Sequence, residues 1–403
     1  MMKDHLPSRL LAPVVAVTAV GLTAYLYLRP ALIRDPSATK PPAPARSPKW
    51  TVLPSLSTLQ RDELPYPPDL LPGGRDVDTP YGSLRVYEWG PEAGEKVLLL
   101  HGIGTPCIAL GEMARALADG GHRVMLFDFF GRGYSDSPTD VPHDARLYNT
   151  QLHLALASSS LPWSGADAFH LVGYSLGGAI AASFARHVPH ALRSLVLVAP
   201  AGLVRPRHVS RTSRLLYSTG VLPEPLLRWL VRRRLEPPAP VDPGAVLDDD
   251  VAGESDATGG ATFDNALLDL ARPELTVARV MRWQLAAHPG FVPAYRSTIR
   301  WAPIYGQGQG EWAPLRGILE ERRAGRVKNG LRGGRVCFVV GETDPVIVAG
   351  ELEQDARLML GEDAVDMRVV KGTGHEVGIT RGREVAGIAM RYWQSIQAAQ
   401  SCS

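Results

Sequence analysis

The sequence predicts an α/β protein whose mostly parallel sheet carries helices on both faces. Uninterrupted apolar runs such as "KVLLL" and "LRSLVLV" are typical of strands that are buried on both sides. Helical segments separate these runs, as they do in parallel sheets. We expect residues 76–201 and 332–403 to form the two parts of this core, and residues 202–331 to be an insertion of helices and loops.

The first part of the core alternates strands with helices. The segment "GSLRVYEWG" alternates polar and apolar residues and predicts a strand, and the next strand is an apolar run that glycines stop. Helices are expected in "IALGEMARALADGG", over residues 148–160 and in "LGGAIAASFARHV". The remaining strands are expected in "KVLLLHGIG", "RVMLFDFFGRGYSDS", "AFHLVGYS" and "LRSLVLVAP".

The same alternation resumes after the insertion. Strands are predicted in "GRVCFVVGETD" and "VDMRVVKGTGH", and helices in "GELEQDARLML" and "GREVAGIAMRYWQSIQ". Within the insertion, "PEPLLRWLVRRRL" and "PELTVARVMRWQLAAH" predict helices without strand partners. An insertion at the carboxyl edge of parallel strands lies where such folds hold their active sites.

The overall composition excludes several classes of function. The 403 residues are 45% hydrophobic and 21% charged, which is ordinary for a globular protein. A net charge of +2 argues against broad electrostatic binding to nucleic acid. The three cysteines, Cys107, Cys337 and Cys402, are too widely spaced for a zinc site or a disulfide framework.

An apolar segment near the N-terminus predicts a transmembrane anchor after a short tail of residues 1–9. Residues 10–28 carry no charge, and a helix that rises about 1.5 Å per residue over them approaches the roughly 30 Å of a bilayer core. Tyr25 and Tyr27 lie near one end, where an interface suits them. The alternative is a signal peptide cleaved at Ala19-Val20-Gly21, but the apolar run continues past that site.

The flanking charges favour a single-pass anchor with the C-terminal domain in the cytosol. More basic residues follow the span than precede it, and the positive-inside rule places them on the cytosolic side. Residues 29–75 combine a linker rich in Pro, Ala and Ser, expected to be extended and disordered, with a lead-in to the core. The basic residues are Lys3 and Arg9 before the span, and Arg29, Arg34, Lys40 and Arg46 after it.

The segment "HLVGYSLGGAI" predicts a nucleophilic serine. It reads Gly-x-Ser-x-Gly around Ser175, with a strand before it and a helix after it. A turn this sharp strains the backbone of the serine, and side chains at positions 173 and 177 would clash, which explains the two glycines. The serine would stand at a helix N-terminus, where free N–H groups suit a developing oxyanion.

A serine nucleophile needs a base, and the base needs an orienting carboxylate. In this architecture the chain order is serine, acid, histidine. His375 in "KGTGHEVG" follows a strand, and we predict it as the base. Asp344 in "VVGETDPV" ends the strand after the insertion, and we predict it as the orienting acid ahead of Glu342. Glu376 ranks far behind because a residue next in sequence to the histidine reaches its ring nitrogen poorly.

Two backbone N–H groups are expected to form the oxyanion hole. Leu176 follows the nucleophile, and Ile103 follows the turn at His101 and Gly102 in "LLLHGIGTP". Because the backbone donates, the side chains of Ile103 and Leu176 matter little. We expect His101 to have a structural role.

Five motifs follow one another along the chain: "LLLHGIG", "DFFGRGYSDS", "GYSLGG", "GETDPV" and "GTGHEVG". In type and order they resemble those of the capped serine hydrolases in the α/β-hydrolase fold superfamily. The resemblance implies Ser175 as nucleophile, His375 as base, Asp344 as its orienter and residues 202–331 as a cap domain. It also implies that Asp128 and Arg132 hold a structural loop. Serine at position 175 argues against epoxide hydrolases and haloalkane dehalogenases, whose nucleophile is aspartate, and "HGIGTPC" differs from the triple-glycine form of many lipases.

The expected function is a membrane-anchored serine hydrolase that cleaves a carboxylic ester or related acyl bond through an acyl-enzyme. Its substrate would be a small hydrophobic ester, and no metal or organic cofactor is implied. Hydrolysis of a carbon–carbon bond or acyl transfer would use the same three residues. A non-catalytic ligand receptor on the same fold is the alternative from another class.

An arginine-rich stretch begins the insertion. Residues 205–234 contain eight arginines against Glu224 alone among the acidic residues. The first interpretation is a solvated helix face that covers a hydrophobic pocket. The second is a contact between the insertion and anionic lipid.

Overall fold

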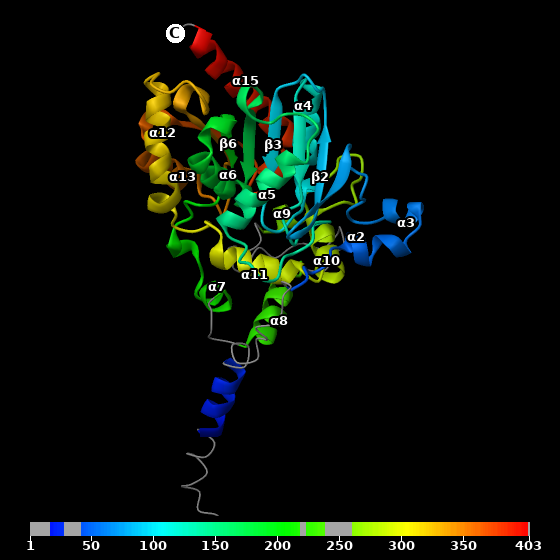
Figure 1. Ribbon diagram of the computed structural model, residues 1–403. Coiled ribbons are helices and arrows are strands. Elements are labelled where there is room, and N and C mark those ends of the chain that lie inside the picture. The colour runs from blue at the N-terminus through cyan, green and yellow to red at the C-terminus, as the bar shows by residue number, and fades with distance from the viewer. Residues whose placement is uncertain (1–16, 28–41, 218–222, 238–259, 402–403) are drawn as a thin grey trace, which may run out of the picture. The chain divides into compact units, whose positions relative to one another are not determined.

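The structure is a computed structural model, and it describes residues 17–27, 42–217, 223–237 and 260–401 (Figure 1). The chain divides into two units, Met1–Ala43 and Pro44–Ser403. In the first unit residues 17–27 are helical. Within the described ranges, no helix combines the length and the apolar character that a membrane crossing requires. The predicted span at residues 10–28 extends beyond the described residues at both ends.

An eight-stranded sheet forms the centre of the second unit, in the order β1-β2-β4-β3-β5-β6-β7-β8. β1 pairs with β2, and β2 with β4, in the antiparallel sense, whereas all the later pairs are parallel. The prediction of a mostly parallel sheet is therefore confirmed. The strands are β1 (Gly74–Thr79), β2 (Gly82–Trp89), β3 (Lys96–Leu100), β4 (Arg123–Phe127), β5 (Phe169–Tyr174), β6 (Leu192–Val198), β7 (Val336–Gly341) and β8 (Val365–Val370).

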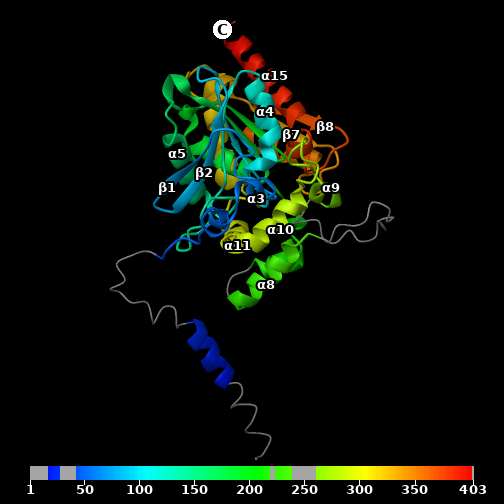
Figure 2. The same cartoon turned by 90° about the vertical axis from the view of Figure 1, so that its right-hand side faces the viewer.

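Helices cover both faces of this sheet (Figures 1 and 2). α4 (Gly111–Asp119) packs with α15 (Gly382–Ser401) on one face. On the other face α6 (Leu176–His187) packs with α5 (Ala145–Ala157) and α12 (Ala313–Arg323), and α12 contacts α13 (Ala349–Leu360). The shorter helices are α2 (Pro48–Thr51), α3 (Thr58–Asp62) and α14 (Val377–Thr380).

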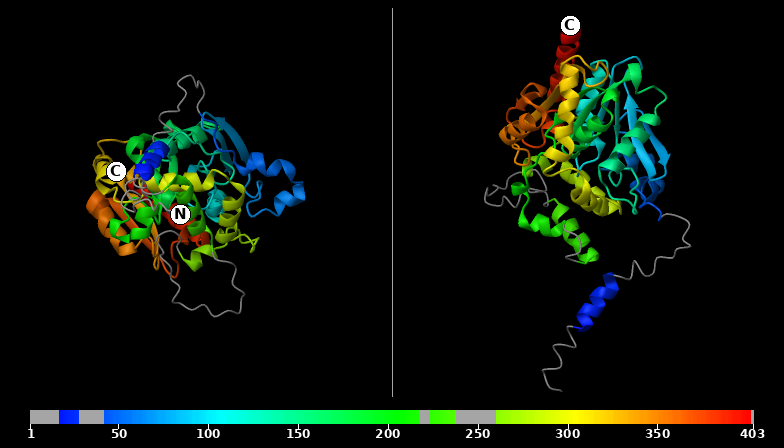
Figure 3. Two further views of the ribbon diagram at one scale, coloured as in Figure 1. Left: turned by 90° about the horizontal axis from the view of Figure 1, so that it is seen from below. Right: turned by 60° about the vertical axis from the view of Figure 1, so that its left-hand side comes forward.

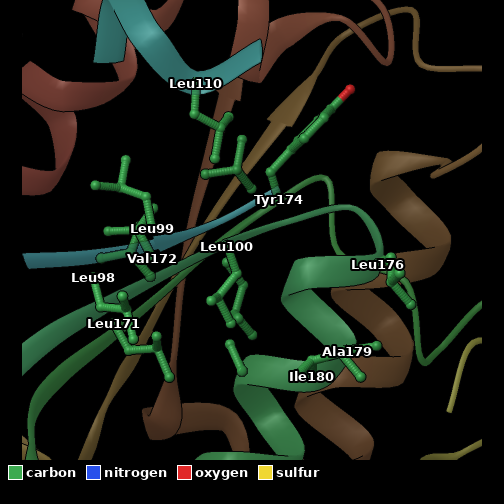
Figure 4. Packing of buried hydrophobic residues seen from close by; sticks show 14 of the residues in the cluster. Leu98, Leu99, Leu100, Leu110, Leu171, Val172, Tyr174, Leu176, Ala179 and Ile180 are labelled. Atoms are coloured by element: carbon green, nitrogen blue, oxygen red, sulfur yellow. The ribbon is translucent and has the colours of Figure 1, made fainter. Parts of the chain in front are cut away.

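Continuous apolar strands make the core. All residues of β3, β5 and β7 are buried, as expected for strands that carry helices on both faces. In Figure 4 the side chain of Leu100 on β3 points toward α6, which carries Ala179 and Ile180, whereas Leu99 points to the opposite face of the sheet. This packing fixes the strand ends from which the candidate site is built.

Residues between β6 and α12 form helices and loops at the end of the sheet where the parallel strands finish (Figures 1 and 3), whereas α12 packs against α6 and α13. Between α12 and the end of β6, no residue in the described ranges belongs to a strand of the sheet. The helices that precede α12 are α7 (Arg211–Leu216), α8 (Glu224–Leu235), α9 (Ala261–Asp264), α10 (Val277–Ala287) and α11 (Phe291–Trp301).

The segment before the first predicted strand differs from the expected linker and lead-in. Ala45 exchanges two backbone hydrogen bonds with Ser137, and the N–H of Ser47 donates to Asp136 at 2.8 Å. Tyr66 is buried, and its hydroxyl donates to the Asp128 carboxylate at 3.1 Å. The compact unit therefore begins at Pro44, and its first strand begins at Gly74, before the predicted boundary at residue 76.

Candidate active site

A sharp turn between β5 and α6 carries Ser175. This serine has a backbone φ of 53°, in the left-handed region that side-chain-bearing residues rarely adopt. A Cβ atom at Gly173 would lie 2.3 Å from the carbonyl oxygen of Gly177, and one at Gly177 would lie 2.3 Å from that of Leu100. Glycine at both positions thus allows the turn to approach its neighbours and projects the serine above the sheet.

The structure brings together the three side chains that the sequence predicts as a triad. The Oγ of Ser175 lies 3.0 Å from Nε2 of His375, and Nδ1 of His375 lies 2.9 Å from Oδ2 of Asp344. Both distances are within the hydrogen-bond range. Asp344 and His375 are buried, so water screens their interaction little. With Nδ1–H donating to the carboxylate, Nε2 is left free to accept the serine proton.

Two loops that follow adjacent strands hold Asp344 and His375 in contact. The Oδ1 atom of Asp344 accepts the backbone N–H groups of Val346 and Ile347, both at 2.8 Å, which leaves Oδ2 for the histidine. A Cβ atom at Gly341 would lie 2.2 Å from the carbonyl oxygen of Gly374. Glycine at the end of β7 therefore permits the close approach of the two loops.

Among the described residues, the carboxylate of Glu376 forms no hydrogen bond with the ring of His375. Its Oε1 accepts the N–H of Gly374 at 2.8 Å and the hydroxyl of Thr373 at 3.2 Å. The carboxylate thus braces the loop on which the histidine stands. Tyr174 braces it from the other side, because its buried hydroxyl donates to the carbonyl oxygen of His375 at 2.8 Å.

The two expected oxyanion donors lie beside the serine. Ile103 and Leu176 line the same pocket as Ser175. Among the described residues, neither backbone N–H donates a hydrogen bond, so both can bind an incoming oxygen. The buried guanidinium of Arg132 donates to the carbonyl oxygens of Ile103 and Phe130 and so fixes the first loop.

His101 has a structural place in the same loop. Its Nε2 accepts the N–H of Phe129 at 2.8 Å, so Nδ1 carries the proton and donates to the Gly102 carbonyl oxygen at 2.7 Å. Burial lowers the pKa of His101 to about 3, which keeps the ring neutral. The buried Asp128 carboxylate accepts the N–H groups of Cys107 and Tyr134, as expected for a structural loop.

A mainly apolar cavity of about 170 Å³ adjoins the serine. The strand-end loops form its floor, and the helices that precede α12 form much of its wall. Asp264 brings a carboxyl group into this wall, and burial raises its pKa above the usual value. The wall residues from the helical segment include Leu235, Phe263, Asp264, Met281, Tyr295 and Ile299. In the described ranges, no cluster of three His, Cys, Asp or Glu side chains is placed to hold a metal ion.

Sequence reasoning did not identify Tyr174 or the cavity wall. Tyr174 occupies a variable position of the serine motif, and its bond to the backbone of a residue 201 positions later leaves no local signal. The wall residues belong to α8–α11, where no motif marks them. The buried amide of Gln284 on α10 also escaped notice, although it accepts the N–H of Gly133 and donates to the carbonyl oxygen of Gly104.

Comparisons with known proteins agree on the fold. Residues 91–251 match the family model described as serine aminopeptidase, S33. The chain is 35% identical over 122 residues to Lipase 1 of Psychrobacter immobilis. This match covers 30% of the present chain and 37% of the lipase. It is 34% identical over 114 residues to 2-hydroxy-6-oxo-6-phenylhexa-2,4-dienoate hydrolase of Comamonas testosteroni, covering 27% and 38% respectively. The chain thus spans less than two-fifths of the length of these relatives.

A solved structure extends the likeness over nearly the whole chain. The crystal structure of a membrane phospholipase A, described as a bacterial virulence factor, matches with a TM-score of 0.54 and 18% identity. The match covers 97% of this chain and 99% of that one. At 18% identity, this likeness shows a shared fold and nothing about activity. With the strand order, the serine turn and the partial sequence matches, it shows that the chain has the α/β-hydrolase fold.

Proposed function

We propose that this protein is a serine hydrolase of carboxylic esters. The observation that carries the proposal is the continuous hydrogen-bonded path from Ser175 through His375 to Asp344 beside an apolar cavity. A base in contact with the hydroxyl and a carboxylate in contact with the base are what an otherwise weak nucleophile needs. The partial matches to proteins named as a lipase and a hydrolase support the same class.

The proposed reaction uses groups already in place. Ser175 attacks the ester carbonyl while His375 takes the serine proton, and the N–H groups of Ile103 and Leu176 bind the oxyanion. The protonated histidine then gives its proton to the departing alcohol, which leaves an acyl-enzyme. Water, deprotonated by the same histidine, attacks the acyl carbonyl and releases the acid and the free serine. Asp344 keeps the imidazole in the required tautomer and stabilises the imidazolium.

The size of the cavity predicts a preference for acyl chains of medium length. A cavity of about 150 Å³ holds a benzene molecule, so we expect this one to hold about six carbon atoms. On nitrophenyl esters of increasing chain length, kcat/KM of the full-length protein should rise to about that length and then fall. A rate that keeps rising to palmitate would show that the acyl chain lies elsewhere. A fluorophosphonate probe, which reacts with activated serines, should label the protein and lose access when the preferred ester is present.

A second candidate activity is hydrolysis of a carbon–carbon bond, which the partial match to the dienoate hydrolase favours. This reaction can use the same three side chains and differs in its leaving group, which is a carbanion equivalent instead of an alkoxide. Turnover of a vinylogous diketone acid with little turnover of any ester in the series would select this alternative. An alcohol acceptor that captures the acyl group in place of water would indicate acyl transfer. If the protein neither turned over these substrates nor reacted with the fluorophosphonate probe, a non-catalytic ligand receptor would be the remaining interpretation.

We also propose that the N-terminal segment anchors the protein in a membrane, with the catalytic unit in the cytosol. The uncharged run at residues 10–28 supports an anchor. Apolar side chains project into solvent from the helix at residues 17–27, among them Val17, Val20 and Leu26. A spanning helix satisfies its own backbone hydrogen bonds, so insertion of such a segment is favourable.

Removal of residues 1–43 should release the protein from membranes without loss of esterase activity. The cut lies before Ala45 and Ser47, because both hydrogen-bond to the body of the compact unit. Full-length protein should resist carbonate extraction and dissolve in detergent, whereas the truncated protein should stay in the supernatant. Two results would contradict the anchor: carbonate removes the full-length protein, or its mature N-terminus begins near Leu22.

A further inference from the structure

A second cleft lies on the opposite side of α11 from the cavity that adjoins Ser175. Its volume is about 400 Å³, and its walls come from α8, α11 and the segment before α5. Tyr295 and Ile299 of α11 line the serine cavity, whereas Arg296 and Arg300 line the second cleft. The lining residues of the cleft that carry the argument are Ser137, His143, Arg228, Arg296, Arg300 and Trp301.

The cleft is strongly cationic. Three arginines line it, and none of its described lining residues is acidic. Glu224 pairs with both Arg296 and Arg300 from outside the lining, which leaves an excess of positive charge. Burial, together with repulsion from Arg300 and Arg228, lowers the pKa of Arg296, although Glu224 opposes the shift. The arginines thus repel one another within the cleft.

Arg228 differs from most arginines of the basic stretch in the insertion. It makes no hydrogen bond or ion pair with any described residue, although it faces Arg296. By contrast, Arg205 pairs with Asp355 at 2.7 Å, Arg207 pairs with Glu351, and Arg232 donates to the carbonyl oxygen of Leu285. The charges expected to form one solvated face are therefore largely used in the fold, and Arg228 remains available for a ligand.

Polar groups and an aromatic ring complete the cleft. His143 is 3% exposed, and its Nδ1 has no hydrogen-bond partner among the described residues, while Nε2 lies 3.4 Å from the Ser137 hydroxyl. The Nδ1 nitrogen is not exposed to the cleft, so the arginines are the groups available to a ligand. Trp301 at the cleft is 56% exposed, an unusual position for a large aromatic side chain.

We propose that this cleft binds a phosphate group. Guanidinium groups pair bidentately with phosphate oxygens, and a phosphate monoester carries enough negative charge to offset the excess on the three arginines. A free phosphate and the headgroup of a phospholipid share this chemistry, and in the second case Trp301 would contact the glycerol or acyl portion. Since α11 separates the cleft from the serine cavity, a ligand here would bind the same helix that shapes the cavity wall. The inference does not depend on the proposed hydrolysis.

The test measures binding to the full-length protein in nonionic detergent, without turnover. Calorimetric titrations use inorganic phosphate and an ether-linked short-chain phosphatidic acid, which no esterase can cleave, with chloride of equal ionic strength as the salt control. Both ligands should bind, and Arg228→Gln should weaken the binding about tenfold, because one charge-assisted contact is lost. Arg233→Gln is the matched control, since Arg233 lies on the same helix and stacks on Trp229 outside the cleft.

The pattern of results separates the sources of the ligand. Equal affinity for the two ligands assigns the cleft to free phosphate, and tighter binding of the lipid analogue, reduced by Trp301→Ala, assigns it to a headgroup. Failure of both ligands to bind would overturn the proposal. An equal loss of affinity in the Arg233→Gln variant would also overturn it, because the weaker binding would then reflect only the lower net charge of the protein. Unchanged unfolding midpoints in the variants exclude misfolding as the cause.

Discussion

Replacement of Ser175 by alanine should abolish ester hydrolysis and fluorophosphonate labelling while the protein stays folded. The hydroxyl is the group that attacks in the proposed reaction, and alanine removes it without adding atoms to the crowded turn. Loss of a serine nucleophile costs about 10⁶ in turnover in a well-characterised protease, and the remainder comes from binding and the oxyanion hole. We expect kcat to fall toward that residual level with little change in circular dichroism or unfolding midpoint.

Ser183 offers a matched control for this variant. It lies on α6, the helix that Ser175 precedes, and it is buried. Among the described residues, its hydroxyl accepts only a long hydrogen bond of 3.3 Å from Asn149. Ser183→Ala should therefore keep nearly full turnover and full labelling. Undiminished labelling of the Ser175 variant would remove this residue from the mechanism, and equal losses in both variants would point to a general disturbance of α6.

Strong local signals explain why much of the fold could be predicted. β3, β5 and β7 are buried along their whole length, so their apolar runs stand out in the sequence. β1 gives no such signal, because its residues alternate between exposed and half-buried positions at the sheet edge. The attachment of residues 44–73 likewise depends on distant partners such as Asp136 and Asp128, which composition cannot reveal.

The candidate site divides in the same way. Ser175, Asp344 and His375 follow strands, and chemistry demands their residue types, so position and type together predict them. Tyr174 acts through one hydrogen bond to a distant backbone atom, and Gln284 acts through two. Such contacts depend on how α10 and the loops pack, and many residues at those positions would be compatible with the local pattern. The substrate cavity is therefore the part that required the structure.

The choice of Asp344 over Glu376 as orienting acid predicts a large difference between two conservative variants. Asp344→Asn should lower kcat by about 10⁴, because an amide favours the wrong imidazole tautomer and does not stabilise the imidazolium. Glu376→Gln removes a charge one residue from the base and keeps a side-chain oxygen able to accept the N–H of Gly374. We expect it to change kcat less than tenfold and to act mainly on stability, through the loop that Thr373 and Gly374 form.

Steady-state kinetics on the preferred ester, paired with thermal unfolding of both variants, distinguishes these outcomes. A catalytic role for Asp344 requires a loss in kcat that its unfolding midpoint does not explain. Labelling rates add an independent measure, since the probe needs an activated serine but no turnover. An equal loss in the two variants, or a larger one for Glu376→Gln, would assign the orienting role to the wrong carboxylate. We expect Asp344 to be the orienting acid, because its Oδ2 lies 2.9 Å from Nδ1 of His375. Its other oxygen is held by the backbone N–H groups of Val346 and Ile347.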